Sequence, residues 1–104
     1  MSLTIISKSL EQADEIANYL IKEKLVIEVN LIEKTQCYKL DANKEVVKSK
    51  AASLVCTTKS LLFNRIDSYL KESYGKNMPT IYSVPVINMD WEQSEILVEG
   101  TLSV

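Results

Sequence analysis

Few side chains in this sequence could carry out chemistry, because histidine is absent and only two cysteines, Cys37 and Cys56, are present. Without histidine the chain has no His-dependent catalytic triad and no His-containing zinc site. The two cysteines are not spaced as Cys-x-x-Cys, and no second pair completes a four-cysteine zinc site. Only two glycines occur, which excludes a glycine-rich phosphate-binding loop. We therefore expect no catalytic residues, no metal site of this kind and no cofactor, and so a protein that is not an enzyme.

Five carboxylates are the remaining candidates for acid–base chemistry or metal binding. Asp14 with Glu15 and Glu92 with Glu95 could be imagined as acid–base pairs, but both pairs are expected on exposed helix faces, where solvation is the ordinary outcome, and no nucleophile accompanies them. Glu28 is the only candidate metal ligand that we name, and a weak one. Three symmetry-related copies of it would place carboxylates together, which suits a hard divalent cation. The sequence favours the alternative, an ion pair between Glu28 and a lysine.

Charge is unevenly distributed along the chain. Twelve Lys and Arg residues against fourteen Asp and Glu give a net charge of −2, which argues against a dedicated nucleic-acid-binding protein. Within residues 34–59, six lysines and two acids give +4, so the remainder carries −6, and four acids but no base follow Asn88. The basic segment is either a solvated hairpin whose lysines protect a strand edge, or an element that docks onto an acidic partner. Its candidate residues for a small anionic ligand are Lys44, Lys48, Lys50 and Lys59.

The elements that must position these residues begin with a short strand rich in β-branched residues over residues 3–8. Ser9 and Gln12 have the spacing of a capping box, with Ser9 as the N-cap. Apolar residues then recur at helical spacing, and acids in the first turns and lysines in the last complement the helix dipole. The pattern predicts a helix over residues 10–22.

An unusually long hairpin is predicted next. Residues 25–40 alternate in polarity with period two, residues 41–44 have the composition of a tight turn, and residues 45–58 return as a second strand. Strands of this length exceed the usual five or six residues. The outer half, residues 33–49, is too polar to cover the core of one small domain. We expect it to protrude and to embrace another subunit.

The second half of the chain predicts a helix over residues 60–73, which Gly75 would terminate in a left-handed conformation. Residues 80–88 are predicted as a fourth strand, and Pro85 within it places that strand at a sheet edge. Residues 91–97 fit either a short helix or a turn. An apolar tail follows, composed of Leu97, Val98, Leu102 and Val104.

The order of elements predicts an α+β fold of the ferredoxin-like βαββαβ type, formed by residues 1–104 as a single domain. Right-handed crossovers place two helices on one face of a four-stranded antiparallel sheet, with the first and third strands central. The other sheet face is left bare, so an oligomer is expected. The apolar residues predicted on that bare face are Val26, Ile32 and Val55.

Pairing the two hairpin strands around residues 42 and 43 predicts where the cysteines lie. Cys37 then faces residue 48 and Cys56 faces Val29, so the two thiols are too far apart for an intrachain disulfide. Cys56 is expected to be a small core residue and not a reactive thiol.

The expected location is the cytoplasm. The opening residues show no charged segment followed by a long apolar one, as a signal peptide would. No apolar run approaches the roughly 18 residues of a transmembrane helix. A membrane is therefore not an expected partner.

Several short motifs resemble the CutA divalent-cation tolerance family, over nearly the whole length. The family's Ala-Cys-Val-Asn run corresponds to Ile27-Glu28-Val29-Asn30, and its aromatic pair on the hairpin to Tyr38 alone. Its Lys-Thr-Thr corresponds to Cys56-Thr57-Thr58. The remaining matches are Tyr74 and Pro79 of its His-Pro-Tyr-Glu-x-Pro motif, Pro85-Val86 of its fourth strand, and Trp91 in its C-terminal helix.

The resemblance implies a homotrimer, related in fold to the PII signalling proteins, that acts in divalent-cation tolerance and in the response to metal ions. Metal binding in the family has been attributed to cysteine and histidine positions, which here hold Glu28 or have no counterpart, so only oxygen ligands remain. The resemblance also places four residues near intersubunit clefts, although interfaces favour such side chains for packing alone. These residues are Tyr38, Thr57, Tyr74 and Trp91.

Two functions therefore remain in view. The first is a non-enzymatic trimeric scaffold or interaction module of the CutA type. The second is a PII-like sensor that binds a small anion or nucleotide in intersubunit clefts. A third, less favoured function is that of a protein that responds to a hard divalent cation bound by Glu28.

Overall fold

The computed structural model describes residues 1–103; Val104, the last residue of the predicted apolar tail, lies outside the described residues. Short 3-10 turns at Ser60–Leu62 and Gly75–Asn77 flank the second helix. The regular elements are β1 (Ser2–Ser7), α1 (Leu10–Lys22), β2 (Val29–Leu40), β3 (Val46–Thr57), α2 (Phe63–Tyr74), β4 (Thr80–Val84) and α3 (Trp91–Gly100).

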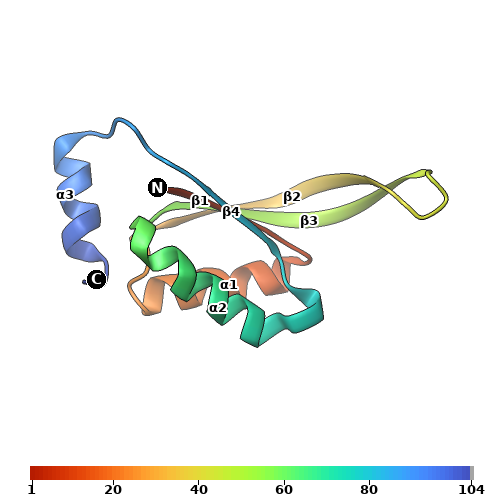
Figure 1. Cartoon of the computed structure of the whole chain (residues 1–104), viewed down its shortest axis with the longest axis horizontal. Coiled ribbons are helices and arrows are strands. Elements are labelled where there is room, and N and C mark those ends of the chain that lie inside the picture. The colour runs from red at the N-terminus through yellow and green to blue at the C-terminus, as the bar shows by residue number, and fades with distance from the viewer. Residues whose placement is uncertain (104) are drawn as a thin grey trace.

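The four strands form one antiparallel sheet in the order β2-β3-β1-β4, which confirms the predicted ferredoxin-like arrangement. Helices α1 and α2 lie side by side under one face of this sheet (Figure 1). The β2-β3 hairpin extends beyond the sheet at one end, and α3 stands at the opposite end. None of the helices within residues 1–103 is long and apolar enough to cross a membrane.

The core lies between the sheet and the two helices. Every second residue of β1 is buried, as expected for a strand with one covered face. Residues at helical spacing on α1 and α2 meet these side chains, and Tyr19 stacks on Tyr69 between the helices with ring centroids 3.5 Å apart. The largest fully buried apolar side chains are Leu3, Ile5, Ile16, Leu20, Leu25, Leu54, Leu62, Ile66 and Leu70.

The start of α1 is fixed by hydrogen bonds that the capping pattern predicts in part. The Ser9 hydroxyl accepts from the backbone N–H of Gln12 at 3.0 Å, as an N-cap should. Gln12 does not return the bond to Ser9. Its Oε1 accepts from the N–H of Lys8 at 2.8 Å, while its Nε2 donates to the carbonyl of Asn77 at 2.7 Å. This nearly buried amide therefore ties the end of β1 to the segment before β4.

The hairpin turn is stabilised by Asp41, whose Oδ1 accepts from the backbone N–H groups of Asn43 and Glu45 at 2.8 and 2.9 Å. Lys44 completes the reversal with a positive φ of 62°. At the far end of the second helix, Gly75 adopts a φ of 50°, which confirms its predicted role as the helix terminator.

The register of the hairpin is as predicted near the sheet and differs farther out. Cys56 pairs with Val29, but Cys37 pairs with Ser49 and not with residue 48. The reason is an irregularity between Ile32 and Thr35, where β2 carries one residue more than β3. Both cysteines are free.

Three other predictions need correction. Val26 is 2% exposed and belongs to the core, because β2 begins only at Val29 and the preceding residues turn inward. Strand β4 ends at Val84, directly before Pro85, which has no N–H to continue the ladder. Residues 91–97, which fitted either a helix or a turn, belong to a helix, α3, that continues three residues farther to Gly100.

A buried threonine anchors the chain beside the core and generates a first prediction. Thr58 is fully buried, and its hydroxyl donates to the carbonyl of Leu25 at 2.6 Å. Thr58→Val leaves that carbonyl without its donor, which should lower the free energy of unfolding by about 1–3 kcal/mol. Urea denaturation measures the loss. The matched control is Thr57→Val, a half-buried neighbour, and equal effects of the two substitutions would contradict the assignment.

The pH dependence of stability gives a second prediction. Burial raises the pKa of the Cys56 thiol from 9.0 to about 12. The folded chain therefore keeps a proton that the unfolded chain loses, so this contribution is complete below pH 9 and disappears as the pH rises towards about 12. Relative to Cys56→Ala, the wild-type chain should lose up to about 1.4 kcal/mol of unfolding free energy per pH unit in that window. Parallel stability curves for the two proteins would show that the thiol is not responsible.

Candidate functional site

The sheet face opposite the helices is not covered by any element of residues 1–103 along most of its length. Side chains alternate along a strand, so the neighbours of the core residues point to this face. Ile32 on β2 is 52% exposed, and Tyr82 and Val84 on β4 are 47% and 53% exposed. This set of residues, together with the half-buried Ile6 and Val55, is called the open face below.

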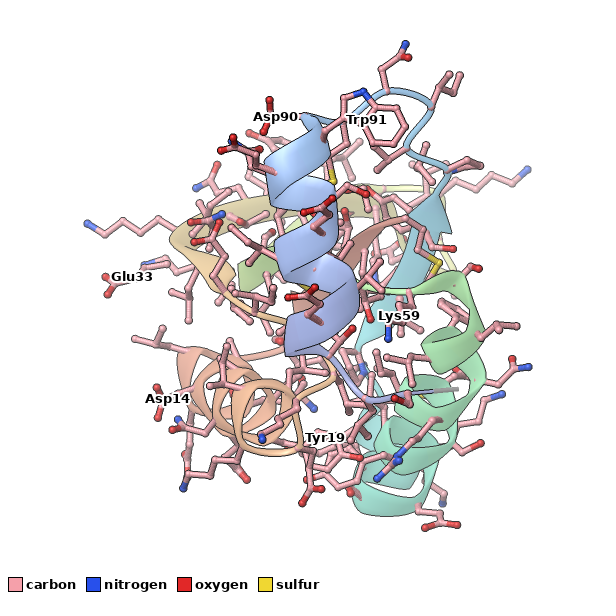
Figure 2. All side chains as sticks on the ribbon, turned by 90° about the vertical axis from the view of Figure 1, so that its left-hand side faces the viewer. Asp14, Tyr19, Glu33, Lys59, Asp90 and Trp91 are labelled. Carbon is pink, nitrogen blue, oxygen red and sulfur yellow. The ribbon has the colours of Figure 1, made fainter. Side chains whose placement is uncertain are left out.

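Helix α3 crosses one end of the molecule beside the open face. Asp90 caps it, since its Oδ2 accepts from the N–H of Gln93 at 3.2 Å. In Figure 2 the helix stands in front of the sheet, with α1 and α2 beneath it and Trp91 at its far end. The segment after α3 is held to the body, because the N–H of Leu102 donates to the Lys24 carbonyl and Lys59 Nζ donates to the Leu102 carbonyl.

Two cavities lie beside α3. One, of about 370 Å³, is bounded by Met1, Thr57, Ile87 and Trp91, among others. The other, of about 400 Å³, lies between α3 and the end of the open face and includes Glu28, Asn30 and Gln93 in its wall. Trp91 is 85% exposed and Ile87 is 91% exposed, so this end of the molecule presents large apolar side chains to solvent.

A third cavity, of about 490 Å³, lies at the other end of the sheet, where the hairpin leaves it. We call it the arm-base cavity. Its wall is formed by residues 6–8 at the end of β1, residues 37–39 on β2, Ser49 and Lys50 on β3, and Met78 and Thr80 near β4.

The four predicted cleft residues are spread over the molecule. Thr57 and Trp91 line the same cavity beside α3, whereas Tyr38 lies in the wall of the arm-base cavity. Tyr74 ends α2 and packs against the core, and burial, followed by the Glu15 and Tyr69 charges, raises the pKa of its phenol. One chain therefore brings two of the four together.

The four predicted anion-binding lysines are also dispersed. Lys44 is at the hairpin tip, and Lys59 is bonded to Leu102 near the C-terminus, at the opposite end of the molecule in Figure 1. Lys48 lies over the ring of Tyr38, with Nζ 5.3 Å from the ring centroid. In the three cavities described above, Lys50 is the one of these four lysines that lies in a wall. A single chain does not assemble these four charges.

The carboxylates do not converge either. Within residues 1–103 no group of three His, Cys, Asp or Glu side chains could hold a metal ion. Glu28 is exposed, and the two ion pairs of this part of the chain, Arg65–Glu23 at 3.9 Å and Lys71–Asp67 at 2.8 Å, do not involve it. Asp14, Glu15, Glu92 and Glu95 are all exposed on helices, as predicted.

The sequence reasoning missed the arm-base cavity. Lys8 and Lys39 are separated by 31 positions and are brought together only because β1 ends where the hairpin continues. Ser7 was overlooked as well. It is fully buried, yet its Oγ has no hydrogen-bond partner among residues 1–103. The lysine count in the hairpin could have found Lys39, but no sequence signal indicates Ser7.

Comparison with known proteins places this fold in a known group. Residues 1–95 match the family model described as CutA1 divalent ion tolerance protein. No curated protein sequence matches the chain.

Solved structures are similar over almost the full length. The divalent cation tolerance protein Cut A1 of Thermus thermophilus is 25% identical, with a TM-score of 0.84, covering 97% of this chain and 99% of that one. CutA1 of Oryza sativa is 17% identical, with a TM-score of 0.88, covering 99% and 94%. A protein of Archaeoglobus fulgidus, described as the periplasmic divalent cation tolerance protein CutA, is 21% identical, with a TM-score of 0.84, covering 95% of each chain. With the family model matched over residues 1–95 and the same fold in these structures, the chain belongs to the CutA1 divalent ion tolerance family.

Proposed function

We propose that this protein is a non-enzymatic homotrimer of the divalent-ion tolerance type that acts as a scaffold or interaction module. The open face carries the proposal. Its large side chains, Ile32, Tyr82 and Val84, are about half exposed in a single chain. Burying such a side chain fully contributes about 1.5–3 kcal/mol, and three copies of the sheet packed together would bury them all.

Features at both ends of the elongated molecule support assembly as well. The hairpin extends beyond the sheet, which gives the molecule a longest dimension of 49 Å against 28 and 21 Å for the other two. Most of its outer residues are exposed, and Thr35 and Cys37 are half-buried. Ile87 and Trp91, which are even more exposed, lie at the opposite end. An arm that reaches over a neighbour would cover such residues, and Tyr38, Thr57, Tyr74 and Trp91 would then line clefts between subunits.

The cation-tolerance role does not need a metal site within the chain. The relatives named above are described as divalent cation tolerance proteins. Here Glu28 stands beside Asn30 and Gln93, and these oxygen and amide groups suit hard cations better than soft ones. We therefore propose a role through assembly, with a cation at Glu28 as the less favoured alternative. We place the protein in the cytoplasm, where its free Cys37 and Cys56 would stay reduced.

One observation favours a second function, the sensing of small anions. Lys50, one of the four lysines predicted for this purpose, lines the arm-base cavity. Lys44, Lys48 and Lys59 would have to come from neighbouring subunits to join it. Anion sensing in intersubunit clefts therefore has weaker support than the scaffold role.

Assembly through the open face is tested by its mass in solution. Sedimentation equilibrium should give the mass of three chains. Ile32→Lys places a charge in the proposed interface and should dissociate the trimer, because a buried unpaired ammonium costs several kcal/mol. The matched control is Leu61→Lys, which is 73% exposed on the side of the helices and should leave the mass unchanged. A wild-type chain that sediments as a stable monomer would refute the proposal.

The charge distribution yields a further prediction for assembly. The basic hairpin of one subunit should meet the acidic C-terminal segment of its neighbour, since residues 34–59 carry +4 and four acids follow Asn88. Lys48→Glu combined with Lys50→Glu should loosen the trimer, and so should 1 M salt, at which the screening length is about 3 Å. Sedimentation that responds to neither change would contradict this contact while leaving the open-face interface in place.

A further inference from the structure

The arm-base cavity exists because neighbouring strands end at different places. β1 stops at Ser7, which pairs with Ala52, whereas β3 continues outward to Val46. The hairpin therefore leaves the sheet with one side of β3 unpaired by β1. The cavity of about 490 Å³ fills this notch, and its size lies within the range of about 300–1,000 Å³ that small-molecule sites occupy.

The charge of this cavity is entirely positive. Three of its ten lining residues are lysines, Lys8, Lys39 and Lys50, and none is acidic. Neither of the two ion pairs within residues 1–103 involves any of these lysines. An anion bound in this hollow would be attracted by these positive charges.

A neutral group in the same wall also lacks a partner. Ser7 is fully buried and lines the cavity, but its Oγ makes no hydrogen bond within residues 1–103. An unsatisfied buried hydroxyl costs about 1–3 kcal/mol. Nearby, Gln12 bonds both the Lys8 N–H and the Asn77 carbonyl. Ser7 lies on the same buried face of β1 as Leu3 and Ile5, so its hydroxyl is a local cost of the fold and not a ligand group.

The geometry points to a binding site for a compact phosphate-bearing polyanion in the arm-base cavity. Lys8, Lys39 and Lys50 would supply the charge. Three separate ammonium groups suit a phosphate chain, whose charge is spread over several oxygens, better than a single carboxylate. The site places the second candidate function, anion sensing, within one chain and without an intersubunit cleft. Lys50 also belongs to the charged contact proposed between subunits, whereas Lys8 lies outside the hairpin. Variants of Lys8 therefore separate anion binding from assembly.

Tyr38 provides a way to distinguish a nucleotide ligand from an inorganic phosphate ligand. Its ring is 59% exposed and lies in the cavity wall, with the Lys48 ammonium on it. Such a ring can stack on a nucleobase, which contributes about 1–3 kcal/mol. A nucleoside diphosphate would use this contact, and an inorganic pyrophosphate would not.

Calorimetric titration of the full chain with pyrophosphate at 0.15 M salt tests the site. We expect saturable binding that is weakened about tenfold by Lys8→Met, which corresponds to about 1.4 kcal/mol. Lys22→Met removes the same charge at the far end of α1 and is the matched control. Ser7→Ala should raise the melting temperature of the free protein, because it removes an unsatisfied buried hydroxyl, and it should leave the affinity unchanged.

Titration with ADP distinguishes the two sources. Tighter binding of ADP than of pyrophosphate, lost in Tyr38→Leu, assigns the site to nucleotides, and equal binding assigns it to inorganic phosphates. The proposal is overturned if no saturable binding occurs, or if Lys22→Met weakens binding as much as Lys8→Met. It is also overturned if Lys8→Met leaves binding intact but lowers the sedimentation mass, since the cavity would then be a contact between subunits.

Discussion

The structure depends on a sheet that is shielded on one face only. Helices α1 and α2 bury the inward residues of β1 and β3, such as Leu3, Ile5 and Leu54, and the described chain offers no second layer for the opposite face. A sheet normally covers each apolar face with another element. The half-exposed Ile32, Tyr82 and Val84 are the consequence, and the proposed assembly rests on them.

Unequal strand lengths are the second constraint, and they locate the candidate ligand site. β1 has six residues and β3 has twelve, so the two cannot pair throughout. The sheet ends where β1 ends, and the hairpin continues alone with lysines along it. The same mismatch therefore creates an arm available to a neighbouring subunit and a positively charged hollow at the base of that arm.

The fold could be predicted from local patterns because the strands and the first two helices have clear signals, whereas the pattern of residues 91–97 fitted a helix or a turn equally well. Period-two and helical spacing identified the elements, Ser9 and Gly75 marked helix ends, and the order of elements fixed the sheet. The register beyond Ile32 could not be predicted, since a bulge of one residue has no sequence signature here. Val26 was misplaced because an apolar residue fits an open strand face and a core-facing loop equally well. The candidate site was the least predictable, because Lys8 meets Lys39 and Lys50 only through tertiary structure.

Family membership carries the architecture of this protein further than its chemistry. A fold is maintained by buried residues, whereas a binding function depends on a few exposed groups that can change without cost to the core. Glu28 occupies an exposed position beside α3, so a carboxylate there is tolerated whatever the relatives have in its place. Lys50 and Lys8 are exposed in the same way. The core preserves the notch between β1 and β3, and the side chains around that notch decide which ligand it can hold. Since those side chains are basic here, the ligand chemistry of this chain must be argued from its own lysines and not from the name of its family.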